Sequence, residues 1–212
     1  MTLYIKNAGS FIEPNEIFVK VFGGDDYYWR PVKETYVNDN GTWRKIFPIA
    51  GSQTYSTAGT FSFVVPQGVY TLSMPVLSGG GGGGRSGQHT GDCHSGVAGG
   101  AGGTVASTSF ATTPGETLTV IVGAGGSGGS YPGFQQGYGM GTVGGTTYVK
   151  RGATTLYTGS GGAVSSGEYY SGSNFTTPGG TNGTGYGTGG TGGCCECNGG
   201  AGVAGVVQFS WS

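Results

Sequence analysis

Six consecutive glycines, Gly79-Gly80-Gly81-Gly82-Gly83-Gly84, follow closely on an apolar stretch at residues 70–77. In that stretch, apolar side chains alternate with Thr, Ser and Pro, which is the two-residue period of a half-buried β-strand. Pro75 lacks the backbone N–H that a ladder needs, so we expect this strand at the edge of a sheet or this residue near its end. Because the glycine run lies between apolar strands rather than at a terminus, we expect it to be built into the fold.

Other glycine-rich runs occupy residues 96–103, 123–129, 137–145 and 177–205. Polyproline-II segments repeat every three residues and have no internal hydrogen bonds, so their buried backbone groups must bond to neighbouring segments. Only glycine, which has no Cβ, lets backbones approach that closely. We therefore predict a bundle of polyproline-II (polyglycine) helices. The alternative is a disordered low-complexity chain, but 13 Tyr, 10 Phe and 3 Trp are more aromatic residues than such a chain needs.

Composition divides the chain into two regions. Residues 1–50 hold 6 of the 9 Lys and Arg, 6 of the 10 Asp and Glu, and only 4 glycines, whereas residues 79–205 hold 44 of the 51 glycines. Ser, Thr, Gly and Gln cluster at residues 48–60, as in a linker or long turn. We predict an N-terminal β attachment module at residues 1–50 and a glycine-rich β/polyproline-II domain at residues 51–212.

The N-terminal region has the pattern of short strands. A strand-like run before Trp29-Arg30 is echoed by a second run before Trp43-Arg44, and Asn38-Asp39-Asn40-Gly41 in the second copy is a tight-turn sequence. The repeat predicts two β-hairpins, with both tryptophans as core residues.

The glycine-rich region carries further strand patterns, at residues 61–65, 116–122, 146–149 paired with 154–157, and 205–211. No segment has a convincing 3.6-residue apolar period, so we expect an all-β fold with almost no helix.

Three motifs follow one another along residues 51–212. They are GTFSFVVPQGV at 59–69 with the glycine run behind it, TPGETLTVIVGAGG at 113–126, and GGAGVAGVVQFSW at 199–211. Together they resemble the glycine-rich domains of many phage tail-fibre and tail-tip proteins, and residues 29–44 resemble a short module of phage tail proteins. The resemblance implies a β-sandwich with inserted polyglycine helices, similar to tail-fibre adhesins. A similar architecture occurs in the ectodomain of anaplastic lymphoma kinase, so the fold alone does not determine function.

The sequence lacks the patterns that are typical of several classes of function. The net charge is −1 without a basic run, so we expect no nucleic-acid partner. No apolar stretch approaches 18 residues, so we expect no membrane span, and residues 1–9 lack the pattern of a secretory signal. Residues 79–85 lack the order of a phosphate-binding loop, and the four carboxylates of the second region form no obvious catalytic pair. We expect no enzyme activity and no cofactor.

The four cysteines form two groups, Cys93-His94 and Cys194-Cys195-Glu196-Cys197. Their spacing matches none of the usual zinc patterns. Free thiols, a disulfide and a metal site all stay open, with free thiols preferred because a phage protein folds in a reducing cytoplasm.

Two aromatic loops among the glycines are the better candidates for a binding site. They combine rings with amide and hydroxyl groups, a mixture that suits a sugar or a protein loop. The equal alternative is that the rings cap the ends of the bundle. The candidate contact residues are Tyr131, Phe134, Gln135, Tyr138, Tyr169, Tyr170, Asn174 and Phe175.

The resulting expectation is a structural component of a bacteriophage tail fibre or tip, made in the host cytoplasm and carried in the virion. Residues 1–50 would bind other tail proteins, and the tip would contact a host surface glycan or outer-membrane protein. By analogy with tail fibres we expect a homo-oligomer, most simply a trimer. The alternatives are a purely structural tail hub or tip protein and an ice-binding glycine-rich bundle.

Overall fold

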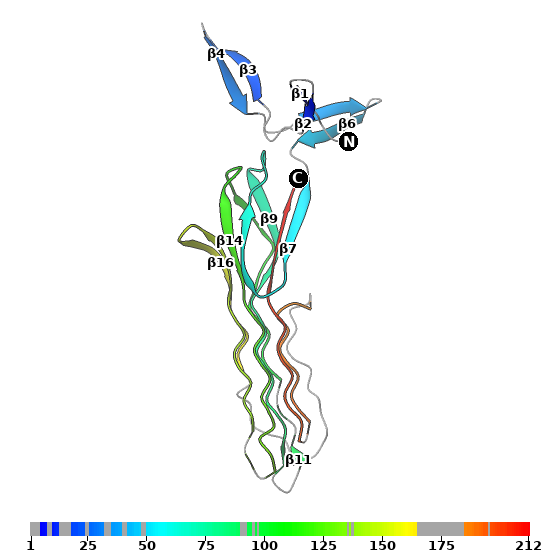
Figure 1. The fold of residues 1–212 in the computed structure, drawn as a ribbon, viewed down its shortest axis with the longest axis vertical. Coiled ribbons are helices and arrows are strands. Elements are labelled where there is room, and N and C mark those ends of the chain that lie inside the picture. The colour runs from blue at the N-terminus through cyan, green and yellow to red at the C-terminus, as the bar shows by residue number, and fades with distance from the viewer. Residues whose placement is uncertain are drawn as a thin grey trace.

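The computed structural model describes residues 5–7, 10–12, 18–23, 26–31, 35–39, 42–47, 50–89, 93–94, 96, 98–134, 136, 138–164, 185–194 and 196–212. These residues form strands, turns and extended segments, and no helix occurs among them. Two antiparallel sheets pack on one another above a long glycine-rich body (Figure 1). The all-β prediction and the predicted β-sandwich are confirmed.

The first sheet has the strand order β12-β9-β17-β7, with β13 also paired to β9. Its strands are β7 (Gly51–Tyr55), β9 (Thr71–Ser78), β12 (Thr104–Val105), β13 (Thr108–Ala111) and β17 (Val206–Trp211). The second sheet has the order β16-β15-β14-β8. Its strands are β8 (Gly59–Val64), β14 (Thr117–Val122), β15 (Thr147–Arg151) and β16 (Thr154–Gly159).

The core lies between the two sheets, where the alternating apolar side chains of their strands meet. Phe209 of β17 is fully buried, with its ring centroid 4.8 Å from that of Phe63 and 6.3 Å from that of Phe110. Leu72 and Met74 of β9 are also fully buried. Burying side chains of this size stabilises a fold by about 1.5–3 kcal/mol each, so this small frame has a substantial core.

The position of β9 corrects one prediction. The strand lies inside the sheet, between β17 and the pair β12 and β13, and not at an edge. Pro75 is tolerated there because neither ladder is continuous at that point. β12 pairs with Leu77 and Ser78 while β13 pairs up to Met74, and the register of β17 shifts between Gln208 and Ser210.

A second correction concerns the predicted linker at residues 48–60. Residues 51–55 of it form β7, which pairs with β17 in the first sheet. Its central residues, Ser52, Gln53 and Thr54, are exposed. Because this edge strand carries polar side chains, its composition resembles that of a loop, and the sequence pattern therefore predicted a linker.

A type II turn at residues 113–116 explains the first residues of the sequence motif at 113–126. The Glu116 N–H donates to the Thr113 carbonyl at 3.0 Å, and Gly115 has a φ of 80°. A type II turn needs this positive φ at its third residue and favours Pro at its second, which is Pro114. Glu116 is then held by Arg151, whose Nε lies 2.8 Å from Oε2.

The N-terminal region contains hairpins, as predicted. β3 (Phe18–Gly23) pairs with β4 (Asp26–Pro31), and β5 (Thr35–Asp39) pairs with β6 (Thr42–Phe47). A third hairpin, β1 (Ile5–Asn7) with β2 (Ser10–Ile12), was not predicted. The packing of the two tryptophans lies outside the described side chains. That residues 1–50 form a separate domain stays a prediction.

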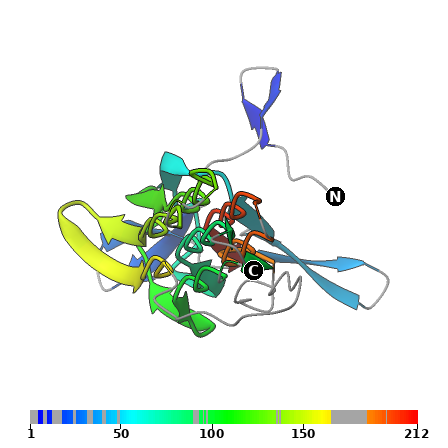
Figure 2. The same ribbon diagram turned by 90° about the horizontal axis from the view of Figure 1, so that it is seen from below.

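The glycine runs form a bundle that continues the sandwich. Residues 79–87 extend directly from β9, and residues 79–84 are buried. Among the residues that the structure describes, six segments surround this central segment. They are residues 98–103, 160–164, 139–146, 123–130, 198–205 and 187–194, in their order around it. Viewed along its axis, the bundle appears as small coils around a central one (Figure 2).

The hydrogen bonds of the central segment rotate among its neighbours. Gly79 and Gly82 donate to residues 103 and 100, Gly80 and Gly83 to residues 145 and 142, and Gly81 and Gly84 to residues 203 and 200, at 2.8–3.0 Å. These three neighbours run back toward the sheets. The central carbonyls accept from the other three segments, which run outward: Gly162 donates to Gly80, Gly126 to Gly81 and Gly190 to Gly82. The ring is closed because each returning segment also donates to the outgoing segments beside it.

This repeat of three is the period of a polyproline-II helix, although the polyproline-II conformation itself stays a prediction. Glycine is required where the segments touch: a Cβ on Gly82 would lie 2.7 Å from the carbonyl carbon of Ala163, well inside van der Waals contact. In the surrounding segments, every third residue instead points outward and has a side chain, as at Ala124, Ser127 and Ser130, which are exposed.

Candidate functional site

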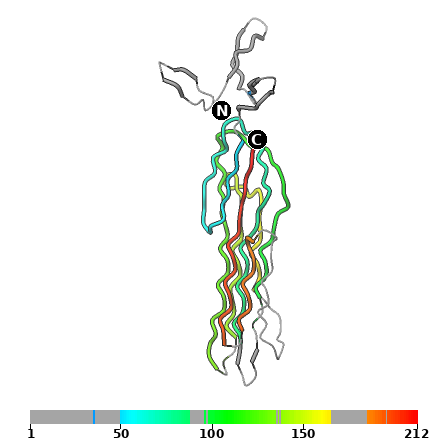
Figure 3. Tube along the Cα trace, turned by 90° about the vertical axis from the view of Figure 1, so that its right-hand side faces the viewer, coloured from blue at the N-terminus to red at the C-terminus, as the bar shows by residue number. Residues whose placement is uncertain are grey.

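The candidate site is the end of the glycine bundle that lies away from the sandwich, which we call the tip. At the opposite end, Gly51 of β7 pairs with Trp211 of β17. Residues 1–50 therefore join the domain at the sandwich end, which the bundle separates from the tip (Figures 1 and 3). The described part of the tip consists of residues 84–89, 93–94, 96, 129–134, 136, 138–140, 193–194 and 196–199.

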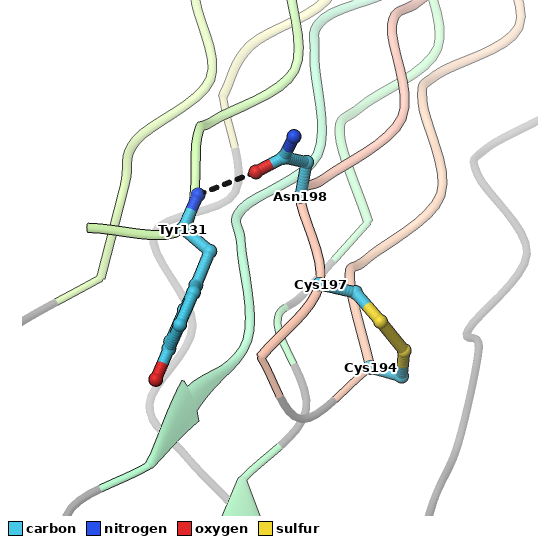
Figure 4. The surroundings of a disulfide bond; sticks show 4 residues. All are labelled: Tyr131, Cys194, Cys197 and Asn198. Atoms are coloured by element: carbon cyan, nitrogen blue, oxygen red, sulfur yellow. Dashed lines mark hydrogen bonds between the residues drawn. A yellow bond between two sulfur atoms is a disulfide. The ribbon is translucent and has the colours of Figure 1, made fainter. Parts of the chain in front are cut away.

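Tyr131 is held in place by the last turn of the bundle. Its backbone N–H donates to Asn198 Oδ1 at 2.6 Å, and Figure 4 shows the Asn198 carboxamide pointing at that nitrogen. The Tyr131 side chain is half-buried, and its hydroxyl is buried without a hydrogen-bond partner among the described residues. Burial and the negative charge of Glu196 raise the pKa of Tyr131 above its usual value.

Tyr138 is fixed by a contact with Arg85. The guanidinium carbon of Arg85 lies 3.9 Å from the centroid of the Tyr138 ring, which is cation–π geometry. Next to this contact, the Ser86 N–H donates to the Gly139 carbonyl at 3.0 Å, and the Gly139 N–H donates to Ser86 Oγ at 2.7 Å. The residue that follows Tyr138 is therefore joined to the central segment twice.

Phe134 is the projecting residue of the same loop, with 56% of its surface exposed. A turn positions it, because the Gln136 N–H donates to the Gly133 carbonyl at 3.2 Å and Gly133 has a φ of 116°. An exposed ring on a short turn can stack on a flat apolar surface.

The second cysteine group forms a turn that joins segments 187–194 and 198–205. Cys194 and Cys197 are linked by a disulfide, with their Cα atoms 5.0 Å apart (Figure 4). The Cys197 N–H also donates to the Cys194 carbonyl at 3.0 Å. Of the three states left open for the cysteines, this pair has the disulfide.

The first group lies in a small hairpin of β10 (Gln88–His89) and β11 (Cys93–His94), in which His89 pairs with Cys93. Nothing in the described residues brings three His, Cys, Asp or Glu side chains together as metal ligands.

The structure thus brings Tyr131, Tyr138 and Phe134 to one end of the molecule with the Cys194–Cys197 turn. The other predicted site residues, Gln135, Tyr169, Tyr170, Asn174, Phe175 and Cys195, lie outside the described residues.

Sequence reasoning missed Arg85 and Asn198, which position the two tyrosines. Two signals were present. Arg85 is the only Lys or Arg between residues 46 and 149. Asn198 falls on the outward three-residue period that runs back from Ala204 through Ala201.

In the described part of the chain, no helix is long and apolar enough to cross a lipid bilayer.

No curated protein sequence matches the chain. The profile of one family, described as a glycine-rich domain, matches residues 55–208. This range begins at the last residue of β7, covers the other strands of the sandwich up to the middle of β17, and includes the whole bundle. The chain therefore belongs to the glycine-rich domain family.

Proposed function

We propose that this protein is a structural component of a bacteriophage tail, in the fibre or at its tip, and that its bundle tip contacts the host cell surface. The observation that carries the proposal is the separation of two ends: residues 1–50 join at the sandwich, and the described loop with Tyr131, Phe134 and Tyr138 lies at the far end of the bundle. The three motifs that resemble phage tail-fibre domains support the same function.

The chemistry of the tip fits a neutral, hydroxyl-rich or aromatic partner. Arg85 and Glu196 are the only charged residues in the described tip, and Phe134 is exposed. A sugar stacks its apolar face on such a ring and bonds its hydroxyl groups to nearby amides. We propose a surface glycan or an outer-membrane protein as the partner, with Gln135, Tyr169, Tyr170, Asn174 and Phe175 as further contacts.

The remaining assignments follow from this function. Residues 1–50 attach the protein to other tail proteins, and the protein works in the virion after synthesis in the host cytoplasm. It acts by binding rather than by catalysis, and it assembles as a homo-oligomer, with a trimer as the simplest state.

Adsorption measurements test the receptor contact. Phage carrying Phe134→Ala together with Tyr138→Ala should adsorb to host cells at least about tenfold more slowly, because loss of two aromatic contacts removes about 1–3 kcal/mol. The matched control is Val64→Ala on β8, since Val64 is 59% exposed but lies on the sandwich. It should adsorb normally.

The thermal stability of the tip variant and its level in virions distinguish receptor binding from a purely structural role and from a role of the rings in capping the bundle. Normal adsorption by the tip variant, in virions that contain it at the normal level, would favour a purely structural tail role. If the tip variant loses thermal stability before it loses adsorption, the rings cap the bundle and do not contact a receptor.

Removal of residues 1–50 tests the attachment module. The remaining glycine-rich domain should stay soluble and folded but should be missing from purified virions. Incorporation of the truncated chain at the normal level would overturn this assignment.

A further inference from the structure

The turn at residues 194–197 connects several parts of the tip through the residues at its two ends. On one side, the Gly193 carbonyl accepts from Gly96 at 2.7 Å, and the Gly193 N–H donates to Arg85 at 2.8 Å. On the other side, the Cys197 carbonyl accepts from Gly87 at 2.9 Å, and Asn198 holds the loop of Tyr131. The geometry of this one turn therefore sets the positions of three neighbouring segments.

The turn has an unfavourable backbone conformation. Glu196 has a φ of 57° and is the only non-glycine residue with positive φ in the described part of the chain. Residues with a Cβ rarely adopt this region unless the surroundings hold them there. Two bonds between described residues close the turn, the Cys194–Cys197 disulfide and the hydrogen bond from the Cys197 N–H to the Cys194 carbonyl.

The disulfide lies where a small reagent can reach it. Cys194 continues the outward period of Thr188 and Thr191, and both Cys194 and Cys197 are only half-buried. The central glycine segment, in contrast, is buried along residues 79–84.

We propose that Cys194 and Cys197 form a reversible redox site for low-molecular-weight thiols and disulfides, and that its oxidation state controls the order of the tip. This proposal is independent of the proposed function. In the oxidising direction, the Cys194 thiolate attacks one sulfur of a small disulfide and releases one thiolate. The Cys197 thiolate then attacks the Cys194 sulfur and releases the second. Two protein thiols are oxidised and one small disulfide is reduced to two small thiols. The two protons lost by the protein thiols are taken up by the two small thiols.

The effect of reduction is local, because the bundle does not depend on the turn. Beyond the turn, segments 187–194 and 198–205 are joined by the bonds from Gly200 to Thr191 and from Val203 to Thr188, both at 2.8 Å. The central segment also bonds to all of its other neighbours. Reduction therefore loosens residues 193–198 and the segments bonded to them, while the rest of the bundle keeps its hydrogen bonds.

Amide hydrogen exchange on the full chain, resolved by residue with NMR, tests the proposal. In the oxidised protein, the amides of Gly87, Gly193 and Tyr131 should be protected. After reduction with dithiothreitol they should exchange at least about tenfold faster, whereas Gly82 and Gly99 should not change. Returning the sample to oxidised glutathione should restore the protection.

The double variant Cys194→Ser with Cys197→Ser is the matched control, because it removes this disulfide and keeps the other two cysteines. Without any reductant, it should already exchange at the tip like the reduced wild type. The proposal is overturned if tip exchange is the same in both redox states, if the bundle loosens together with the tip, or if the untreated double variant keeps the protection of the oxidised wild type. Thiol trapping with mass spectrometry on the wild type reports the redox state of the pair directly, even if the variant fails to fold.

Discussion

Two adjacent glycines of one bundle segment provide a sharp test of why glycine is required. A Cβ on Gly99 would lie 2.5 Å from the carbonyl carbon of Gly82 and 2.8 Å from that of Gly83 in the central segment. A Cβ on Gly100 would lie 3.2 Å from the Ala163 carbonyl oxygen and 3.3 Å from its nitrogen. Gly99→Ala should therefore destabilise the protein strongly, and Gly100→Ala should not.

The size of the effect follows from the distances. Ordinary contact with a Cβ begins at 3.4 Å, and the Gly82 carbonyl oxygen lies even closer to the added Cβ than its carbon does, so the segment of Gly99 must move away by at least about 0.9 Å. The bond from Gly82 to Gly100 and the bond from Gly99 to Gly190, both 2.8 Å, would then be too long for hydrogen bonds. Loss of each hydrogen bond lowers the free energy of unfolding by about 1–2 kcal/mol, including the penalty for the buried groups left unpaired. Lower entropy of the unfolded chain offsets about 0.4–1 kcal/mol, which leaves a net loss of about 2 kcal/mol.

Urea denaturation and thermal melting measure this difference. For a domain of this size, 2 kcal/mol corresponds to a Tm about 4–8 °C lower. Gly100→Ala has the same effect on the unfolded chain, so its free energy of unfolding should lie within about 1 kcal/mol of the wild type. Equal stability of the two variants would refute the claim that close backbone contact is what requires glycine.

Three further predictions concern the core, the tip and the charge of the surface. Phe209→Ala removes a fully buried ring and should lower the free energy of unfolding by about 3–5 kcal/mol; a loss below about 1 kcal/mol in urea denaturation would mean that the core is not closed there. Glu196→Gln should lower the pKa of Tyr131, because the Glu196 charge contributes to raising it; the change is measured by ultraviolet titration against Tyr131→Phe, and an unchanged titration would contradict the proximity of the two residues. Adsorption through the tip should change less than about threefold between 50 and 500 mM NaCl, because the described residues from 50 to 212 carry only five charged side chains and salt screens charge interactions alone; a steep salt dependence would point to a charged contact elsewhere.

The strands were largely predictable, because their side chains alternate between core and solvent. The hairpin of β15 and β16 and the last strand β17 were expected within one or two residues. The strands β12 and β13 were not predicted. Two other errors fell where one ladder departs from the regular pattern or where side chains have no apolar partner. Pro75 lies opposite a break in both ladders, and β7 exposes polar side chains.

The arrangement of the bundle could not be predicted in the same way. Identical glycines carry no side-chain information about which segment lies next to which, so the order of the ring depends on the frame of strands. The residues at every third position, such as Thr188 and Thr191, mark only the outward face. The same limit applies to the tip. Tyr131 and Tyr138 are visible in the sequence as aromatic residues among glycines. The hydrogen bond that Tyr131 donates to Asn198 and the contact of the Tyr138 ring with Arg85, however, join residues more than 50 positions apart.

The place of β17 in the first sheet has a consequence for synthesis. β17 is the last strand in chain order, yet it lies between β9 and β7 and contributes Val207 and Phe209 to the core. The segment that precedes it, residues 198–205, also closes the ring around residues 79–87. A nascent chain leaving the ribosome cannot complete the sheet or the ring until β17 has emerged.

Contacts between segments so distant in sequence form slowly, so the domain should fold only once β17 has left the ribosome, and in one cooperative step. Until then, β7 and β9 have no partner between them, and their free edges are open to pairing with other chains. Stalled ribosome complexes that lack β17 should therefore hold a protease-sensitive chain, whereas release of a chain that includes β17 should be followed by a single transition to resistance.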